Sequence, residues 1–274
     1  MEKYLKVYDT LNKNIIYDFR LGSGGVGDLT KFFMHLLNIC IDKNIKIHYL
    51  INSTYVEKYL KLVHSKMYIT SETISKYKNH VIQRPSDIDN MKNHDYYIIE
   101  PFALYESFRA EENHNYHMKS YNAITIPLRE LFYFSEEVKV HTLLNNTTYI
   151  SLHLRMGDKY LETDKQFVLC REDSRHFYEA NICDFIEANQ DKKILFCCDN
   201  NSYKLKLKKK YNQIMITDFV IGHTSLSNTT ENEVLNALKE FYLLSNSEEL
   251  YAASFGGFSI MASKFKQIPV FQLF

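Results

Sequence analysis

The chain has 274 residues, 45% hydrophobic and 24% charged, the composition of an ordinary globular protein long enough for one large domain or two smaller ones. Lys plus Arg and Asp plus Glu both number 33, so no net basicity points to a nucleic-acid partner. Because there is no secretory signal and no apolar run long enough to cross a bilayer, we expect a cytoplasmic protein without a membrane span. The five cysteines lack C-x-x-C spacing and are interpreted as reduced, buried thiols.

In the first half of the chain, predicted strands alternate with predicted helices. The expected strands cover residues 14–19, 46–51, 66–70, 80–82 and 96–100, and the expected helices cover 29–41 and 54–64. This alternation is typical of a parallel, doubly wound α/β domain.

The loop that joins the first strand to the first helix is rich in glycine. Gly22, Gly24 and Gly27 satisfy the dinucleotide fingerprint G-x-G-x-x-G, but the acid expected at the end of the second strand is replaced by Asn52. The loop also resembles a P-loop, although Asp28 stands where the required Lys belongs and would repel phosphate, so we exclude an NTPase. The remaining hypotheses are backbone amides that approach a ligand across a cleft, and a tight turn without any ligand.

Two patterns could hold a metal ion, and we predict that neither does. Asp87 and Asp89 form a D-x-D tripeptide, but Ser86 or Asp87 is expected to cap a helix there. His114 and His117 lie in a polar loop with no third ligand nearby.

The α/β alternation restarts in the second half, so we expect one domain at 1–135 and another at 136–274. Segment 127–140 has a helical pattern. The later expected strands are 147–155, 193–198, 213–217, 249–253 and 270–273, and the expected helices are 174–188, 202–210, 230–244 and a last one ending at 265. The lysine-rich helix 202–210 is interpreted as a solvated face.

Charged and glycine residues follow the first strand of the second half, where a ligand would lie in an open α/β sheet. Arg155 offers a fork of donors suited to phosphate, and Lys159 offers a mobile charge. Gly157 would let the backbone turn close to a ligand. The alternative is a surface loop that contains an Arg–Asp pair.

Two further strand ends carry polar groups that suit a ligand. Asp199 and Asn200 could accept hydrogen bonds from a base or ribose, or could cap the next helix. Segment 254–259 offers hydroxyls and free amides at a helix start, which is either an anion site or a plain turn.

Three motifs resemble those of the fucosyltransferase superfamily of GT-B glycosyltransferases. Residues 153–158 match H-x-R-x-G-D, and Lys159 extends the likeness to the α1,6 branch. Residues 24–28 are similar to the family's G-G-x-G-N/D loop, and residues 240–245 with 254–259 are similar to its last motif. The resemblance covers residues 24–262 and implies two Rossmann-like domains, with parallel sheets, that face a cleft.

The resemblance implies an inverting, metal-independent glycosyltransferase that moves a sugar from a nucleotide-diphosphate donor to a glycan hydroxyl. The donor is a co-substrate, and no cofactor or metal is expected. Arg155 would bind the β-phosphate and stabilise the leaving diphosphate. The other donor-binding residues carried over or expected near the donor are Gly25, Gly27, His153, Lys159, Asp199, Asn200, Glu240, Ser254, Gly257 and Ser259.

An inverting displacement benefits from a general base on the acceptor hydroxyl, and Asp28, Asp158 and Glu162 are the candidates. Glu240 replaces the family's usual Asp and Gly257 replaces a Ser, so a UDP-sugar such as UDP-xylose stays open beside GDP-fucose. Segments 160–171 and 218–224 would decide base and sugar. The alternative functions are an NAD(P)-dependent oxidoreductase that uses the first glycine loop, and a non-catalytic nucleotide- or sugar-binding module.

Overall fold

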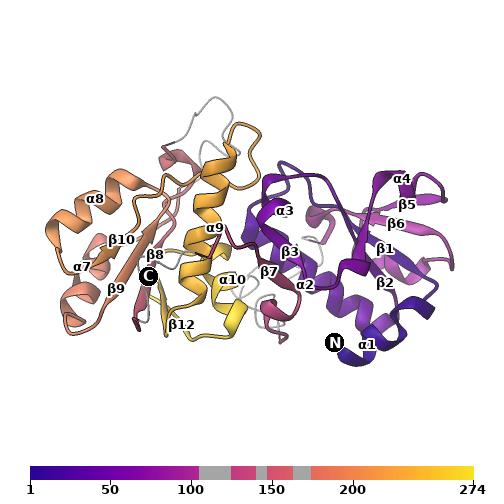
Figure 1. Cartoon of the computed structure of the whole chain (residues 1–274), viewed down its shortest axis with the longest axis horizontal. Helices are drawn as coiled ribbons and strands as arrows, with labels where there is room; N and C mark the ends of the chain where they lie inside the picture. Colours follow the sequence, from indigo (N-terminus) through magenta and orange to yellow (C-terminus); the bar gives the residue numbers. More distant parts are fainter. Residues whose placement is uncertain (105–124, 140–146, 163–173) are drawn as a thin grey trace.

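A computed structural model describes residues 1–104, 125–139, 147–162 and 174–274 of the chain, which forms two α/β halves that lie side by side (Figure 1). The first half contains a five-stranded sheet in which every neighbouring pair of strands is parallel. Its strands, in spatial order, are β4 (Tyr68–Ile69), β2 (Lys46–Leu50), β1 (Asn14–Tyr17), β6 (Tyr96–Ile99) and β5 (Asn79–Ile82).

The second half contains another five-stranded parallel sheet. Its strands, in spatial order, are β10 (Met215–Ile216), β9 (Ile194–Cys198), β8 (Ile150–Leu154), β11 (Leu250–Ala252) and β12 (Val270–Gln272). Every residue of the central strand β8 is buried, as expected for a parallel sheet covered on both faces. The predicted pair of parallel α/β sheets is therefore present.

The helices cover these sheets and fill the space between the two halves. The α-helices are α1 (Glu2–Val7), α2 (Val26–Lys43), α3 (Tyr55–Tyr59), α4 (Ser71–Ile74), α7 (Glu179–Ala188), α8 (Asn201–Lys210), α9 (Glu231–Ser245) and α10 (Gly257–Lys266). Short 3-10 helices are η1 (Tyr8–Thr10), η2 (Ser65–Met67), η3 (Pro85–Asn90), η4 (Leu128–Glu130) and η5 (Asp158–Tyr160). None of the helices in the described segments is both long and apolar enough to cross a bilayer.

One predicted helix is confirmed only in its first part and another is wrong, because a small antiparallel sheet occupies both segments. The helix that begins at Tyr55 is capped by Thr54, as its sequence suggests, but it ends at Tyr59 and continues as β3 (Leu60–Leu62). The segment predicted as helix 127–140 contains η4 and then β7 (Phe132–Phe134), which pairs with β3. In both strands the first and third residues are buried and the middle one is more exposed. Three residues are too few to distinguish this period of 2 from the period of a helix.

The two halves share one hydrophobic core where α9 and α10 of the second half meet α2 and α3 of the first (Figure 1). Phe134 stacks on Phe265 with ring centroids 4.6 Å apart, and Phe241 packs beside them. The start of α10 lies directly against the start of α2, where Gly27 approaches the Gly257 backbone, and both helix starts border a cavity. Four cysteines, Cys40, Cys183, Cys197 and Cys198, are buried free thiols, while Cys170 lies outside the described residues.

Candidate active site

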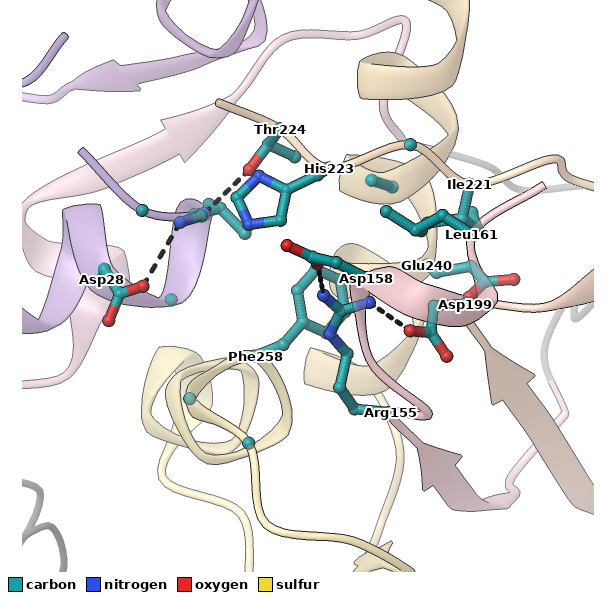
Figure 2. A pocket seen from close by; sticks show the side chains of 18 of the residues that line it. Asp28, Arg155, Asp158, Leu161, Asp199, Ile221, His223, Thr224, Glu240 and Phe258 are labelled. Carbon is teal, nitrogen blue, oxygen red and sulfur yellow. Dashed lines mark hydrogen bonds and ion pairs between the residues drawn. The ribbon is translucent and has the colours of Figure 1, made fainter. Parts of the chain in front are cut away.

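A cavity of about 380 Å³ lies between the two halves, at the carboxyl end of β8 (Figure 2). This is the place where open α/β sheets bind ligands, and the volume is that of a small-molecule site. The lining residues come from both halves and are Gly24, Gly25, Val26, Gly27, Asp28, His153, Arg155, Asp158, Leu161, Arg175, Asp199, Ile221, Gly222, His223, Thr224, Ala237, Glu240, Gly256, Gly257 and Phe258.

The Arg155 side chain, directly after β8, is fixed in the wall of this cavity. Its backbone N–H donates to Ser254 Oγ at 2.9 Å, and the Ser254 hydroxyl donates to the Arg155 carbonyl oxygen at 2.7 Å. Its guanidinium forms ion pairs through Nη1 with Asp199 and through Nη2 with Asp158. The side chain keeps 17% of its surface exposed, so this cation borders the cavity while two carboxylates hold its orientation.

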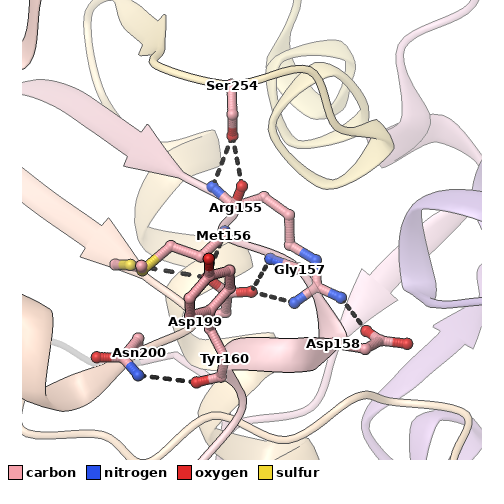
Figure 3. A network of polar contacts seen from close by, with 9 residues as sticks. Arg155, Met156, Gly157, Asp158, Tyr160, Asp199, Asn200 and Ser254 are labelled. Carbon is pink, nitrogen blue, oxygen red and sulfur yellow. Dashed lines mark hydrogen bonds and ion pairs between the residues drawn. The ribbon is translucent and has the colours of Figure 1, made fainter. Parts of the chain in front are cut away.

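Asp199 also anchors the loop that carries Arg155 (Figure 3). Its carboxylate accepts hydrogen bonds from the backbone amides of Met156 at 2.7 Å and Gly157 at 3.0 Å. Gly157 has a φ of 112°, a conformation that favours glycine, and η5 begins directly after it. Asp199 therefore sets the geometry of residues 155–157, a role that the sequence did not indicate, while its contact with a base or ribose stays a prediction.

His153, on β8 two residues before Arg155, is a neutral ring in the cavity lining. It is almost fully buried and stacks on Phe258 with ring centroids 5.3 Å apart. Burial lowers the pKa of this imidazole to about 4, because the charged form loses its solvation. Its Nδ1 has no hydrogen-bond partner among the described residues. His153 therefore supports the site by packing and as a neutral polar group, without adding positive charge.

Glu240 also lines the cavity, and its carboxylate belongs to a buried network of ion pairs and hydrogen bonds. Lys204 Nζ, fully buried, donates to Glu240 Oε1 at 2.9 Å, to Thr217 Oγ1 at 3.0 Å and to the Phe219 carbonyl oxygen at 2.8 Å. Thr217 also hydrogen-bonds to the Glu240 carboxylate. Burial raises the pKa of Glu240, which the nearby lysine opposes.

Lys204 corrects the prediction that the lysine-rich helix is only a solvated face. The helix α8 buries Tyr203, Lys204 and Leu207, so Lys204 lies on its apolar side. Lys204 lies three residues before Leu207, and residues three apart share a helix face, so this spacing could have predicted that Lys204 is buried. The high lysine content of residues 204–210 instead suggested that every lysine of this helix faces solvent.

The glycine loop is used mainly to join the two halves. A Cβ on Gly27 would lie 2.7 Å from the carbonyl carbon of Gly257, so only glycine allows α2 to approach α10 this closely. The Val26 amide donates to Thr224 Oγ1 at 2.9 Å, and the Gly22 amide donates to the Ser225 carbonyl oxygen at 2.7 Å. These amides are therefore occupied by protein groups, which disfavours a pyrophosphate at the dinucleotide fingerprint.

Two of the three candidate general bases cap helices. Glu162 accepts hydrogen bonds from the amides of Asn201 at 2.9 Å and Ser202 at 2.8 Å, so it caps α8 and lies outside the cavity lining. Asp28 lines the cavity, but its carboxylate accepts from the Gly25 amide at 3.3 Å in a capping box. Lys31 also donates to Asp28, at 3.1 Å.

Four predicted donor-binding residues also lie outside the cavity lining. Asn200 caps α8 by accepting from the Tyr203 amide at 2.7 Å, and the Ser259 hydroxyl donates to the Gly256 carbonyl oxygen at 3.3 Å. Ser254 holds the Arg155 backbone, as described above, and Lys159 is exposed on η5. Direct contact of these four side chains with the donor stays a prediction, and the contacts described give three of them a structural role as well.

Sequence reasoning singled out none of several further cavity residues, because they lie in loops without a recognisable motif. Arg175 is a second arginine of the lining, and His223 accepts a hydrogen bond at Nδ1 from the Ser225 amide at 3.3 Å. Ile221 and Leu161 add apolar wall. Of the segments expected to decide base and sugar, residues 221–224 line the cavity, whereas 163–171 lie outside the described residues.

The D-x-D tripeptide has a structural role in the first half. Asp87 accepts from the Arg84 amide at 3.1 Å and so caps η3, while Asp89 pairs with Lys43. His114 and His117 lie outside the described residues. Within the described segments, no three His, Cys, Asp or Glu side chains are grouped as a metal ion would require.

No protein-family model and no curated protein matches the sequence, but solved structures do. A mutant of Arabidopsis thaliana FUT1 in complex with GDP has a TM-score of 0.58 at 10% identity, covering 99% of this chain and 74% of that one. Fucosyltransferase NodZ from Bradyrhizobium has a TM-score of 0.53 at 12% identity, covering 92% of each chain. POFUT1 in complex with GDP has a TM-score of 0.51 at 9% identity, covering 96% of this chain and 98% of that one. The chain therefore has the GT-B-like α/β fold of these fucosyltransferases, as its motifs predicted.

Proposed function

We propose that the chain is an inverting, metal-independent glycosyltransferase that moves a sugar from a nucleoside-diphosphate donor to a hydroxyl of a glycan. The observation that carries the proposal is the Arg155 guanidinium, held at the carboxyl end of β8 in a cavity bordered by the start of α10. Residues 136–274, which supply most of this wall, form the donor domain in this proposal, and residues 1–135 form the acceptor domain.

The donor diphosphate is bound by Arg155 together with the start of α10. A guanidinium forms paired hydrogen bonds with phosphate oxygens, and a helix start offers free amides and a positive dipole end. Gly256, Gly257 and Phe258 border the cavity, and the N-cap residue of α10 is Gly256, which has no side chain to bond the first amides of the helix. When the sugar leaves, these donors stabilise the charge that develops on the diphosphate, an effect worth several kcal/mol in enzymes of this kind.

GDP-fucose is the donor that the proposal favours over a UDP-sugar such as UDP-xylose. Lys204 and Thr217 bond to Oε1 of Glu240, and a carboxylate has about four acceptor positions in all. The remaining positions suit the two adjacent N–H donors of guanine, whereas uracil offers one. Ile221 and Leu161 provide apolar wall for the base. The similar FUT1, NodZ and POFUT1 structures were solved with GDP, which supports the same choice.

The two alternative functions make different predictions. The oxidoreductase hypothesis needs free amides at the first glycine loop, and Thr224 and Ser225 occupy two of them. The hypothesis of a non-catalytic binding module needs the same cavity but no turnover, so only an activity measurement separates it from a transferase.

The test is a thermal-shift series with GDP, UDP and NAD, followed by GDP release from GDP-fucose. A ligand that binds only the folded chain raises its Tm, so we expect GDP to raise it most. Arg155→Ala should abolish GDP release while the Tm without ligand confirms folding, and Arg155→Lys should restore little because Lys lacks the planar fork. Wild-type turnover in Arg155→Ala would refute the proposal, and GDP binding without any turnover in the wild type would support the non-catalytic module.

A further inference from the structure

We propose that Asp158 is the general base that takes the proton of the acceptor hydroxyl, and that the donor diphosphate makes it available by displacing it from Arg155. The inference rests on the proposed function and extends it to the base and to the order in which the two substrates bind. Among the three carboxylates that sequence reasoning offered, Asp158 both borders the cavity and contacts the phosphate-binding cation. Glu162 and Asp28 serve as helix caps.

The ion pairs of Arg155 must rearrange when a diphosphate arrives. The guanidinium already bridges two carboxylates, Asp199 at Nη1 and Asp158 at Nη2. A diphosphate at the same guanidinium would add several negative charges next to these two, in a wall that is mostly buried, where repulsion between like charges is weakly screened. One carboxylate therefore has to give up its place on the cation.

The contacts of Asp199 indicate that Asp158 is the one displaced. Asp199 is fixed by the Met156 and Gly157 amides as well as by the guanidinium, so moving it would break the turn that carries Arg155 (Figure 3). Asp158 begins the short helix η5 directly after Gly157. In Figure 2 its carboxylate lies between the Arg155 guanidinium and the His223 ring, on the side of the cavity that faces the glycine loop of the first half.

The displaced carboxylate then has the position and charge for proton transfer. The acceptor oxygen attacks the anomeric carbon and forms the new C–O bond while its proton passes to an Asp158 oxygen. The bond from the anomeric carbon to the β-phosphate oxygen breaks, and its electron pair leaves with GDP, whose charge Arg155 stabilises. Asp158 later loses the proton to solvent. An empty donor site keeps Asp158 on Arg155, so the donor binds before the acceptor.

The variant Asp158→Asn tests whether Asp158 is a general base or only a structural partner of Arg155. Asp199→Asn is the matched control, because Asp199 pairs with the same guanidinium. GDP affinity is measured by titration calorimetry, and turnover is measured as GDP release from GDP-fucose with water as acceptor. In Asp158→Asn we expect GDP to bind as tightly as in the wild type or up to about tenfold more tightly, because a competing charge is gone. Turnover should fall about 10²- to 10⁴-fold, the range of general-base catalysis. In Asp199→Asn both quantities should fall, because the 155–157 turn loses its anchor.

A second variant at the same position keeps the inference testable if the asparagine side chain of Asp158→Asn disturbs the site. Asp158→Ala leaves space where formate can act as an external base, so formate should raise its GDP release in proportion to concentration and leave Arg155→Ala unchanged. The inference is overturned if Asp158→Asn weakens GDP binding as much as turnover, if it keeps more than a tenth of wild-type turnover, or if formate has no effect on Asp158→Ala. A wild type that neither binds GDP nor releases it from GDP-fucose would instead overturn the proposed function, and this inference with it.

Discussion

Gly27→Ala tests whether the glycine loop serves the contact between the two halves or a bound dinucleotide. The new Cβ would lie 2.7 Å from the Gly257 carbonyl carbon and 2.9 Å from the Phe258 amide nitrogen, whereas ordinary contact begins near 3.4 Å. Both neighbours are backbone atoms that cannot rotate away, so the starts of α2 and α10 must separate by roughly 0.7 Å.

The expected cost in free energy of unfolding is about 1–2 kcal/mol. Overpacking of this kind costs about 1–3 kcal/mol, and replacing a helical glycine by alanine returns less than about 1 kcal/mol. The GDP affinity should also fall, because the displaced Gly257 and Phe258 backbone borders the proposed phosphate site.

Gly25→Ala is the matched control, since it changes the same loop and borders the same cavity. Its Cβ would lie 3.5 Å from Thr224 Oγ1, which is an ordinary contact, so the only expected loss is that of a glycine N-cap of α2, at most about 1 kcal/mol. Urea unfolding of the three proteins measures the difference as a shift in midpoint at constant slope. The reasoning is refuted if Gly27→Ala and Gly25→Ala unfold at the same urea concentration.

Two further predictions concern buried charge. Lys204→Met should lower the free energy of unfolding in urea by about 3–5 kcal/mol, because it leaves the Glu240 carboxylate buried without its cation. The double variant Lys204→Met/Glu240→Gln should recover most of that loss. An unchanged urea midpoint in Lys204→Met would contradict the ion-pair network. Burial lowers the pKa of His35, His48 and His153 to about 4, so the stability they contribute is complete above pH 6.5 and is lost as the pH falls toward 4. The unfolded imidazoles are half protonated at pH 6.5, so each histidine should lower the free energy of unfolding by about 1.6 kcal/mol between pH 6.5 and pH 5, and the three together by about 5 kcal/mol. His48→Gln should remove about a third of that loss, and a urea midpoint that does not change with pH would contradict the prediction.

The sequence predicted the fold well where strands and helices are long and periodic. The strand 46–51, the amphipathic helix after the first glycine loop and the helix 230–244 all match elements of the structure within a few residues. It failed at β3 and β7, where two short segments pair across more than 60 residues of chain and local periodicity carries too little information. The six-residue α1 was missed because it is anchored by tertiary contacts such as the hydrogen bond from Tyr4 to the Ile45 carbonyl oxygen.

In the candidate site, motifs located the cavity but not the detailed contacts. Arg155, His153, Asp199 and Glu240 all border the cavity. The first two come from the H-x-R-x-G-D match, Asp199 from a strand end, and Glu240 from the likeness to the family's last motif. Motif position could not reveal that the Ser254 hydroxyl is occupied by the Arg155 backbone, because that hydrogen bond joins residues 99 positions apart. Residues without a motif, such as His223, are brought to the cavity only by the packing of the two halves.

The charges around the cavity predict that GDP binding depends only weakly on salt. Among the described residues, four carboxylates and two arginines line it, and two of those carboxylates, Asp28 and Glu240, have lysine partners, so this part of the wall has no surplus of positive charge. Affinity must then come from oriented donors, namely the Arg155 fork and the start of α10, which lie in a mostly buried wall and are little screened by ions. We expect the Kd for GDP to rise less than about threefold between roughly 0.05 and 0.5 M NaCl in titration calorimetry, since the Debye length changes mainly the interactions of exposed charges. A rise of a hundredfold would mean that exposed lysines such as Lys159 carry the binding, and the placement of the diphosphate at Arg155 would have to be abandoned.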